Sequence, residues 1–226
     1  MNRMKPSVKK IAVVMMTMAG GAFAGPGPEI AAQKELKKVL AKKGDVVAGK
    51  DRYQAACASC HLETGAGQPD GSFPQLAGQH PAVVLKQLTD IRAGARENAV
   101  MLGAAQSLSE QDMADIAAFL KILPIPRDNG RGEGEFLDDG QVLYKRDCVS
   151  CHGRSGEGDP KTYTPVLAGQ HYKYLLRQMT NIRDGKRLNA NPKMMDAIKG
   201  YTDTQVLAVT DFMSRLVMPE LPKKKK

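Results

Sequence analysis

The sequence predicts an all-α protein that consists of two tandem, similar domains. Three observations support this prediction. Matching residues recur at a fixed offset of 91 residues, apolar residues in both copies follow a helical period, and no stretch shows the alternation typical of a β-strand. A repeat of this length corresponds to a whole small domain rather than to one unit of a solenoid.

Two strings define the repeat. Cys-Ala-Ser-Cys-His at 57–61 returns as Cys-Val-Ser-Cys-His at 148–152, and Leu-Ala-Gly-Gln-His at 76–80 returns at 167–171. Other residues that match at the same offset are Gly49, Tyr53, Pro74, Gln87, Ile91, Arg92, Gly94, Arg96 and Asn98 in the first copy. The offset becomes 93 further along, where Phe119 matches Phe212, so the second copy gains two residues. This density of matches indicates a duplicated domain.

Amphipathic patterns and capping signals predict the helices of each copy. In the first copy, one helix is expected around residues 84–91, and a second should begin after Ser109 and end at Pro124. In the second copy, Thr202 and Gln205 form a capping box, and the helix that follows is expected to stop at Pro219. The stripes expected to be buried are Val84, Leu85, Leu88 and Ile91; Met113, Ile116, Ala117 and Leu120; and Val206, Val209 and Met213.

The first 24 residues resemble a secretory signal peptide. A basic start precedes an apolar core from Ile11 to Met18, and Ala22-Phe23-Ala24 has the small-x-small form of a cleavage site. An uncleaved anchor is the alternative, although the apolar core is too short to span a bilayer as a helix. We therefore expect an exported protein, and the attachment chemistry considered below suits the periplasm.

The chain divides into six segments. The segments expected after the signal peptide at 1–24 are a basic helical extension at 25–43, a first domain at 44–123, a linker at 124–135, a second domain at 136–219 and a basic tail at 220–226. For the extension, a packing helix and a loosely attached arm are both open interpretations.

The net charge of +9 comes almost entirely from the two ends of the chain. Four basic residues lie within the first ten positions and four lysines occupy 223–226, so the remainder carries a net charge of +1. This is not the composition of a nucleic-acid-binding protein, and no nucleic acid is expected as a partner.

The pattern C-x-x-C-H is the attachment site of c-type haem. Each thiol adds across a vinyl group of the porphyrin, and the adjacent histidine then points its imidazole at the iron. Two disulfides or a tetrahedral zinc site are alternatives, but neither requires a histidine directly after both cysteine pairs. The sequence therefore predicts two covalently bound haem c groups, held by Cys57, Cys60 and His61 and by Cys148, Cys151 and His152.

Two methionines are the expected distal ligands of the two irons. Met101 lies seven residues before Leu108, and Met194 lies seven residues before Tyr201, the equivalent position. Both follow stretches that resemble loops. A thioether suits haem iron and raises its potential. We therefore expect the metal ligands to be His61, Met101, His152 and Met194.

Two alternatives to this ligand set stay open. Met195 is the close rival of Met194, because one extra loop residue would exchange the two. His80 and His171 each directly precede a helix, and they leave bis-histidine ligation as the second alternative.

Pro74 and Pro165 are further candidate haem-site residues. Each lies 13 residues after its haem histidine. A backbone carbonyl fixed by the proline could accept the imidazole Nδ1 proton, which would orient the ring and tune the iron. A simple turn proline is the alternative.

Taken together, these motifs resemble the di-haem class I cytochromes c of the cytochrome c4 type. The resemblance rests on both C-x-x-C-H motifs, on the strings around Pro74 and Pro165, and on the segment from Met101, and it covers roughly residues 44–219. It implies two tandem class I cytochrome c domains, each wrapped around one covalent haem, that shuttle electrons in the periplasm and have no enzymatic activity.

The resemblance also implies redox protein partners. The expected donor is a protein such as a quinol-oxidising complex, and the expected acceptor is a terminal oxidase or reductase. Association with a membrane surface is a further candidate. The alternatives are a cytochrome subunit of a larger dehydrogenase, such as a flavin-dependent sulfide oxidiser, and a di-haem peroxidase-like enzyme.

One docking hypothesis follows from charge. Basic residues gather around one expected helix of the second copy, and a matching acidic partner would be steered toward them. These residues are Lys173, Arg177, Arg183, Lys186 and Arg187. A solvated helix face is the alternative.

Overall fold

The computed structural model describes Met1 and residues 27–219. The predicted signal peptide, beyond Met1, and the basic tail therefore lie outside the described residues. Within the described part the structure is helical, without strands, and its one isolated β-bridge joins Asp159 and Thr164. None of the described helices is long and apolar enough to cross a membrane.

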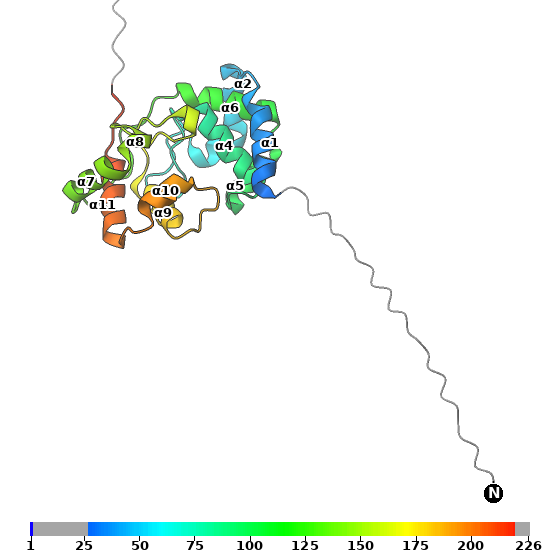
Figure 1. The fold of residues 1–226 in the computed structure, drawn as a ribbon. Helices are drawn as coiled ribbons and strands as arrows, with labels where there is room; N and C mark the ends of the chain where they lie inside the picture. The colour runs from blue at the N-terminus through cyan, green and yellow to red at the C-terminus, as the bar shows by residue number, and fades with distance from the viewer. Residues whose placement is uncertain (2–26, 220–226) are drawn as a thin grey trace, which may run out of the picture.

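The two copies of the repeat fold into two similar helical domains that lie side by side (Figure 1). The helices of the first domain are α1 (Pro28–Leu40), α2 (Val46–Ala56), α3 (Ala58–His61), α4 (Pro81–Arg92), α5 (Ala99–Ser107) and α6 (Glu110–Ile122). Those of the second are α7 (Leu137–Asp147), α8 (Val149–His152), the 3-10 helix η1 (Pro160–Thr162), α9 (Tyr172–Arg183), α10 (Pro192–Ile198) and α11 (Asp203–Ser214).

A close helix pair forms the frame of each domain: α2 packs on α6, and α7 packs on α11. The matched glycines allow this approach, because a Cβ atom at Gly49 would lie 2.0 Å from the carbonyl oxygen of Asp115, and one at Gly140 would lie 2.2 Å from that of Ala208. An aromatic pair closes each contact, with ring centroids 5.5 Å apart for Tyr53 and Phe119 in the first domain.

The capping box expected at Thr202 is confirmed, and the helix expected after Ser109 begins with a capping box as well. Ser109 and Asp112 cap α6, and Thr202 and Gln205 cap α11. Helix α6 ends at Ile122, as Pro124 predicts. The expected stop at Pro219 is wrong, because α11 already ends at Ser214.

Helix α1 is a packing helix and not a loosely attached arm. It lies against α4 and α6, on the side of the first domain that faces away from α7 and α11 (Figure 1). Leu36 and Val39 are buried in the same apolar core as Tyr53 and Leu120. The helix is therefore an integral part of the first domain.

The segment between the domains is also packed. Ile125 lies against Gly78 of the first domain and Gly169 of the second. The buried side chain of Asn129 donates hydrogen bonds to the carbonyls of Gln170 and Ser214. This connection therefore helps to fix the two domains relative to one another.

Candidate haem sites

Each C-x-x-C-H motif forms a single helical turn. The amides of Cys60 and His61 donate to the carbonyl of Cys57, at 3.2 and 3.0 Å, and the second motif repeats this arrangement around Cys148. All four cysteines are free thiols, which counts against the disulfide alternative. In the part of the chain that the structure describes, no three metal-ligating side chains of Cys, His, Asp or Glu converge, which counts against a zinc site.

The structure places a proline carbonyl against each haem histidine, as the repeated offset predicts. The Nδ1 atom of His61 lies 2.9 Å from the carbonyl oxygen of Pro74, and that of His152 lies 3.2 Å from the carbonyl oxygen of Pro165. Because a carbonyl can only accept, Nδ1 is the protonated nitrogen, and the Nε2 lone pair of each ring is left to bind a metal.

The Nε2 atom of His61 is buried and has no hydrogen-bond partner among the described residues. Such orphaned buried polar atoms are rare in folded proteins and call for an explanation. Burial also lowers the pKa of both His61 and His152, although their proline carbonyls act in the opposite direction. A neutral imidazole with a free Nε2 is the form that binds haem iron, so these residues fit the cofactor.

A buried tyrosine anchors the chain just after each haem histidine. The Tyr53 hydroxyl donates to the carbonyl of Leu62 at 2.8 Å, and the Tyr144 hydroxyl donates to that of Gly153 at 2.7 Å. Burial raises the pKa of both hydroxyls, so they remain protonated donors. Sequence reasoning gave these tyrosines no such role, although their match in the repeat was a signal.

Met101 and Met194 occupy the same position in two short helices. Met101 is the third residue of α5, whose N-cap is Asn98, and Met194 is the third residue of α10, whose N-cap is Asn191. The stretches that precede them, 93–98 and 184–191, are turn and loop as expected, whereas the two short helices themselves were not predicted. Short helices escape a periodicity search because they offer only about two turns.

Met195 is not excluded by burial. Both Met194 and Met195 are half-buried and pack against the core of the second domain. Only the helical register distinguishes the two. Met194 has the same position in α10 that Met101 has in α5, whereas Met195 is one residue further along.

His80 and His171 have partners in the opposite domain. The Nε2 atom of His80 lies 2.8 Å from the carbonyl oxygen of Glu157, and that of His171 lies 2.8 Å from the carbonyl oxygen of Ala66. Each contact is the symmetry counterpart of the other, because both pairs match in the repeat. These contacts count against bis-histidine ligation and give the repeated Leu-Ala-Gly-Gln-His string a role at the junction between the domains.

A charged network lies at the same junction. Arg96 donates to Gln87, Tyr174 and Gln178, while Arg187 donates to Gln87 and Gln178. Burial and the neighbouring Arg96 lower the pKa of Arg187 to about 10. The network therefore concentrates positive charge in a part-buried place, where Asp90 is an anion that favours the charged form of Arg187.

The docking hypothesis needs correction at three of its five residues. Arg187 belongs to the part-buried network, Arg177 donates to the carbonyl of Gly71 and stacks on Tyr174, and Arg183 pairs with Asp184 and Asp203. Lys173, Arg177 and Lys186 are exposed, as the hypothesis requires, although Arg177 makes the contacts just described and Lys186 pairs with Asp184. Sequence neighbours on one helix thus have different structural roles.

Arg92 stabilises the C-terminal end of α5 through hydrogen bonds. Arg92 donates from Nε to the carbonyl of Ala105 at 2.8 Å, and from Nη1 to Glu35 of α1 at 2.5 Å. The carbonyls at the end of a helix lack partners within it, and a cation is favourable there. Its counterpart Arg183 reaches the carbonyl of Tyr201 and pairs with Asp184 and Asp203, whereas Arg92 pairs with Glu35 of α1.

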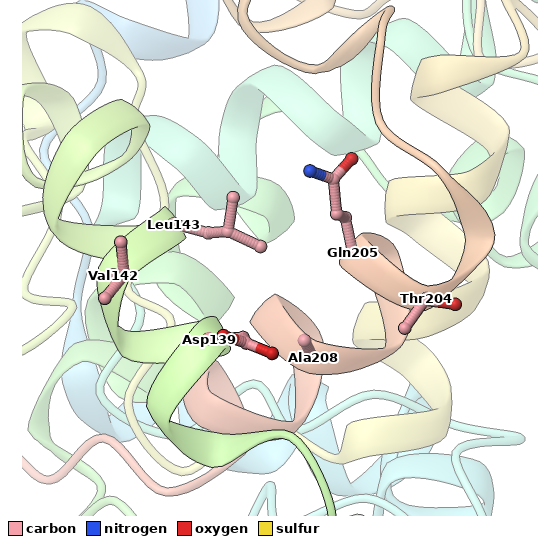
Figure 2. A pocket seen from close by; sticks show the side chains of 6 residues that line it. All are labelled: Asp139, Val142, Leu143, Thr204, Gln205 and Ala208. Atoms are coloured by element: carbon pink, nitrogen blue, oxygen red, sulfur yellow. The ribbon is translucent and has the colours of Figure 1, made fainter.

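A surface pocket in the second domain lies away from these residues, between α7 and α11. Figure 2 shows its lining, which comprises Asp139, Val142, Leu143, Thr204, Gln205 and Ala208. In the first domain, the positions of Leu143 and Gln205 are taken by Arg52 and Asp112, which form an ion pair. No predicted haem-site residue lines the pocket, and we assign it no role in the site.

Comparison with known proteins identifies the fold. The cytochrome c family model matches residues 46–124 and, a second time, residues 137–216. The chain belongs to the cytochrome c family. Cytochrome c4 of Pseudomonas aeruginosa is 33% identical over 183 residues, which cover 76% of this chain and 89% of that protein.

Other relatives agree. A thiosulfate dehydrogenase electron acceptor of Stutzerimonas stutzeri is 35% identical over 182 residues, covering 76% of this chain and 84% of the relative. The crystal structure of reduced cytochrome c4 from Pseudomonas stutzeri superposes with a TM-score of 0.69 at 30% identity, covering 76% of this chain and 99% of that one.

These findings confirm the expected all-α fold of two cytochrome c domains, with two covalently bound haem c groups. The chain is a di-haem electron-transfer cytochrome that works with redox partners, and it is not an enzyme.

Proposed function

We propose that this cytochrome c is a periplasmic carrier whose two irons are ligated by His61 and Met101 in the first domain and by His152 and Met194 in the second. One observation carries the ligand proposal: His61 presents a buried Nε2 atom without a partner among the described residues, while Pro74 holds its Nδ1 atom. The equal helix positions of Met101 and Met194 support the distal ligands.

When bound, the haem supplies one-electron redox chemistry, and the protein supplies ligands, burial and a docking surface. With His61 and Met101 bound to one iron and His152 and Met194 bound to the other, no coordination site would be open to a substrate. Cys57 and Cys60, together with Cys148 and Cys151, would hold the two porphyrins. This arrangement favours the carrier over the peroxidase-like alternative.

The positive charge at the domain junction fits the same cofactor. A haem carries two propionate carboxylates, and the part-buried guanidinium groups of Arg96 and Arg187 lie together with Asp90 as the carboxylate that favours the charge of Arg187. We infer that propionates complete the charge balance of this network, because an uncompensated buried charge is strongly unfavourable.

For the partners, we propose a quinol-oxidising complex as donor and a terminal oxidase or reductase as acceptor. A periplasmic dehydrogenase is a second candidate donor, because two relatives are named thiosulfate dehydrogenase electron acceptors. Association with a membrane surface stays a candidate, for which the lysine-rich exposed side of α1 offers positive charge.

The decisive experiment uses the full-length protein, expressed with haem attachment. The mature protein should be found in the periplasm, cleaved after Ala24, with two haem masses that survive denaturation. Changing Met101 to His should abolish the methionine–iron charge-transfer absorption of one haem and lower its potential, because a thioether favours ferrous iron. An unchanged spectrum in Met101→His would refute the ligand assignment, and an uncleaved protein would refute the export proposal.

A further inference from the structure

The side chain of Gln79, in the first domain, forms two hydrogen bonds with the backbone of Val166 in the second. The Val166 amide donates to Oε1 of Gln79 at 3.0 Å, and Nε2 of Gln79 donates to the Val166 carbonyl at 3.2 Å. Gln79 and Val166 are both buried, so water does not compete with these bonds.

One of these bonds involves the peptide unit that faces the second haem histidine. The Val166 amide and the Pro165 carbonyl belong to the same peptide unit, and the Pro165 carbonyl accepts from Nδ1 of His152. A continuous chain of hydrogen bonds therefore runs from Gln79 through one peptide unit to the imidazole of His152. Hydrogen bonds in such a chain polarise one another and strengthen cooperatively.

The reciprocal series of hydrogen bonds, from the second domain to the first, is present as well. The Gln75 amide donates to Oε1 of Gln170 at 3.0 Å, and Nε2 of Gln170 donates to the Gln75 carbonyl at 3.0 Å. The Pro74 carbonyl of that peptide unit accepts from Nδ1 of His61. Each domain thus supports the haem histidine of the other.

A second contact fixes the same loop. The Nε2 atom of His80 contacts the carbonyl of Glu157, and the next residue, Gly158, donates its amide to the carbonyl of His152 at 2.9 Å. In the first domain, His171 contacts the carbonyl of Ala66, and Gly67 donates to the carbonyl of His61. Two independent contacts therefore cross the junction toward each haem histidine.

We propose that Gln79 is a positioning residue for the haem of the second domain, and Gln170 for the haem of the first. Each glutamine polarises the proline peptide unit in the opposite domain, which makes the facing imidazole a stronger donor to iron. This inference rests on the proposed role of His61 and His152 as proximal ligands.

The physical consequence is that the reduction potential of each haem depends on a glutamine of the opposite domain. A stronger bond from Nδ1 raises the basicity of the imidazole and stabilises ferric iron. Removing the glutamine should therefore favour reduction of the haem in the opposite domain and leave the haem of its own domain nearly unchanged. The junction then does more than hold the domains together.

The test compares Gln79→Met with Gln170→Met in the complete di-haem protein. Methionine has a similar length but lacks both the amide donor and the strong acceptor oxygen. Redox titration should show that Gln79→Met raises the reduction equilibrium constant of the second haem about fivefold, and that Gln170→Met does so for the first. Gln111→Met, which alters a glutamine away from the junction, is the matched control.

The two haems can be assigned without reference to the methionine ligands. Ser59 and Ser150 are exposed and lie within the C-x-x-C-H motifs, so Ser59→Asp and Ser150→Asp should each lower the potential of the adjacent haem. Hydrogen exchange provides a second readout: the Val166 amide should exchange faster in Gln79→Met, and the Gln75 amide faster in Gln170→Met.

Gln79→Glu retains an oxygen that accepts from the Val166 amide, and it should return the second potential toward the original value. Equal shifts of both haems in each variant, or a shift confined to the variant's own domain, would overturn the inference. An unchanged spectrum in Met101→His would instead refute only the distal ligand, because the crossed pattern does not depend on it.

Discussion

Glu35 of α1 forms an ion pair with Arg92 of α4, with 2.5 Å between Oε1 and Nη1 and with each side chain 20% exposed. The same guanidinium donates to the carbonyls of Ala105 and Leu108, at and just beyond the end of α5. Helix α1 lies outside both segments that the family model matches. An extra helix therefore contributes the anion that holds Arg92 against the helix of the proposed ligand Met101.

Replacing Glu35 with Gln should lower the free energy of unfolding by about 1–2 kcal/mol, because it removes the charge partner of a largely buried arginine. The first haem should also lose its methionine–iron absorption at a lower concentration of added imidazole, since the end of α5 is held less firmly. Thermal unfolding and imidazole titration of the di-haem protein would measure the two effects.

Lys34→Gln is the control for this experiment, because Lys34 is an exposed residue of the same helix. It should change the free energy of unfolding by less than about 0.5 kcal/mol. If Glu35→Gln is equally silent, then α1 does not brace the end of α5.

Gly49→Ala should destabilise the first domain by about 1–3 kcal/mol, because its Cβ atom would meet the carbonyl of Asp115 at 2.0 Å and force α2 away from α6. Gly103→Ala is the matched control. It lies in α5 with nothing within 4 Å of its Cβ position, so alanine should be neutral or stabilise by up to about 1 kcal/mol. Equal effects of the two substitutions in chemical denaturation would contradict the close-approach argument.

Much of the fold follows from local sequence signals. The haem motifs, the two capping boxes and the helices at α4, α6 and α11 are all encoded within short windows, where period and capping chemistry are visible. Helices α2 and α7 were not predicted, because few of their residues are buried: Gly49 and Tyr53 in α2, and Gly140, Leu143 and Tyr144 in α7. These residues do not form a continuous apolar stripe.

The sequence predicted the contacts of the candidate sites that lie within one domain, but not those that join the two domains. The contact between His61 and Pro74 spans 13 residues and is repeated, so the sequence revealed it. The partners of Gln79 and His80 lie 87 and 77 residues away in the other domain, and no local pattern indicates which surfaces meet. The same limitation explains why Arg187 was assigned to an exposed docking face.

His171 should make the domain junction sensitive to acid. Its Nδ1 atom accepts from the Gly130 amide at 3.1 Å and its Nε2 atom donates to Ala66, so the neutral ring satisfies both partners. Burial lowers its pKa below the ordinary value of 6.5, although the Ala66 carbonyl, Asp70 and Asp128 oppose the shift. The unfolded chain therefore binds this proton first, and its stabilising contribution is complete above about pH 6.5 and is lost as the pH falls through the folded pKa.

His171→Gln should flatten the dependence of unfolding free energy on pH between about pH 7 and 5, whereas Lys173→Gln, a change at an exposed neighbour, should retain the original slope. Chemical denaturation across this range would measure both slopes. An unaltered slope in His171→Gln would show that the ring does not titrate in the way proposed.

The choice between Met194 and Met195 depends on helical register. An N-cap asparagine precedes Met101 by three residues in α5, and Asn191 precedes Met194 by three residues in α10, so these two side chains leave their helices in the same direction relative to the cap. Successive residues on a helix point about 100° apart, so Met195 faces elsewhere.

Met194→His should therefore remove the methionine–iron absorption of the second haem and lower its potential. Met195→Leu should preserve both properties and cost less than about 1.5 kcal/mol of stability, since it exchanges one apolar side chain for another of similar volume. Loss of the absorption in Met195→Leu, with retention in Met194→His, would reverse the assignment and show that the two domains present their ligands from different positions of α5 and α10.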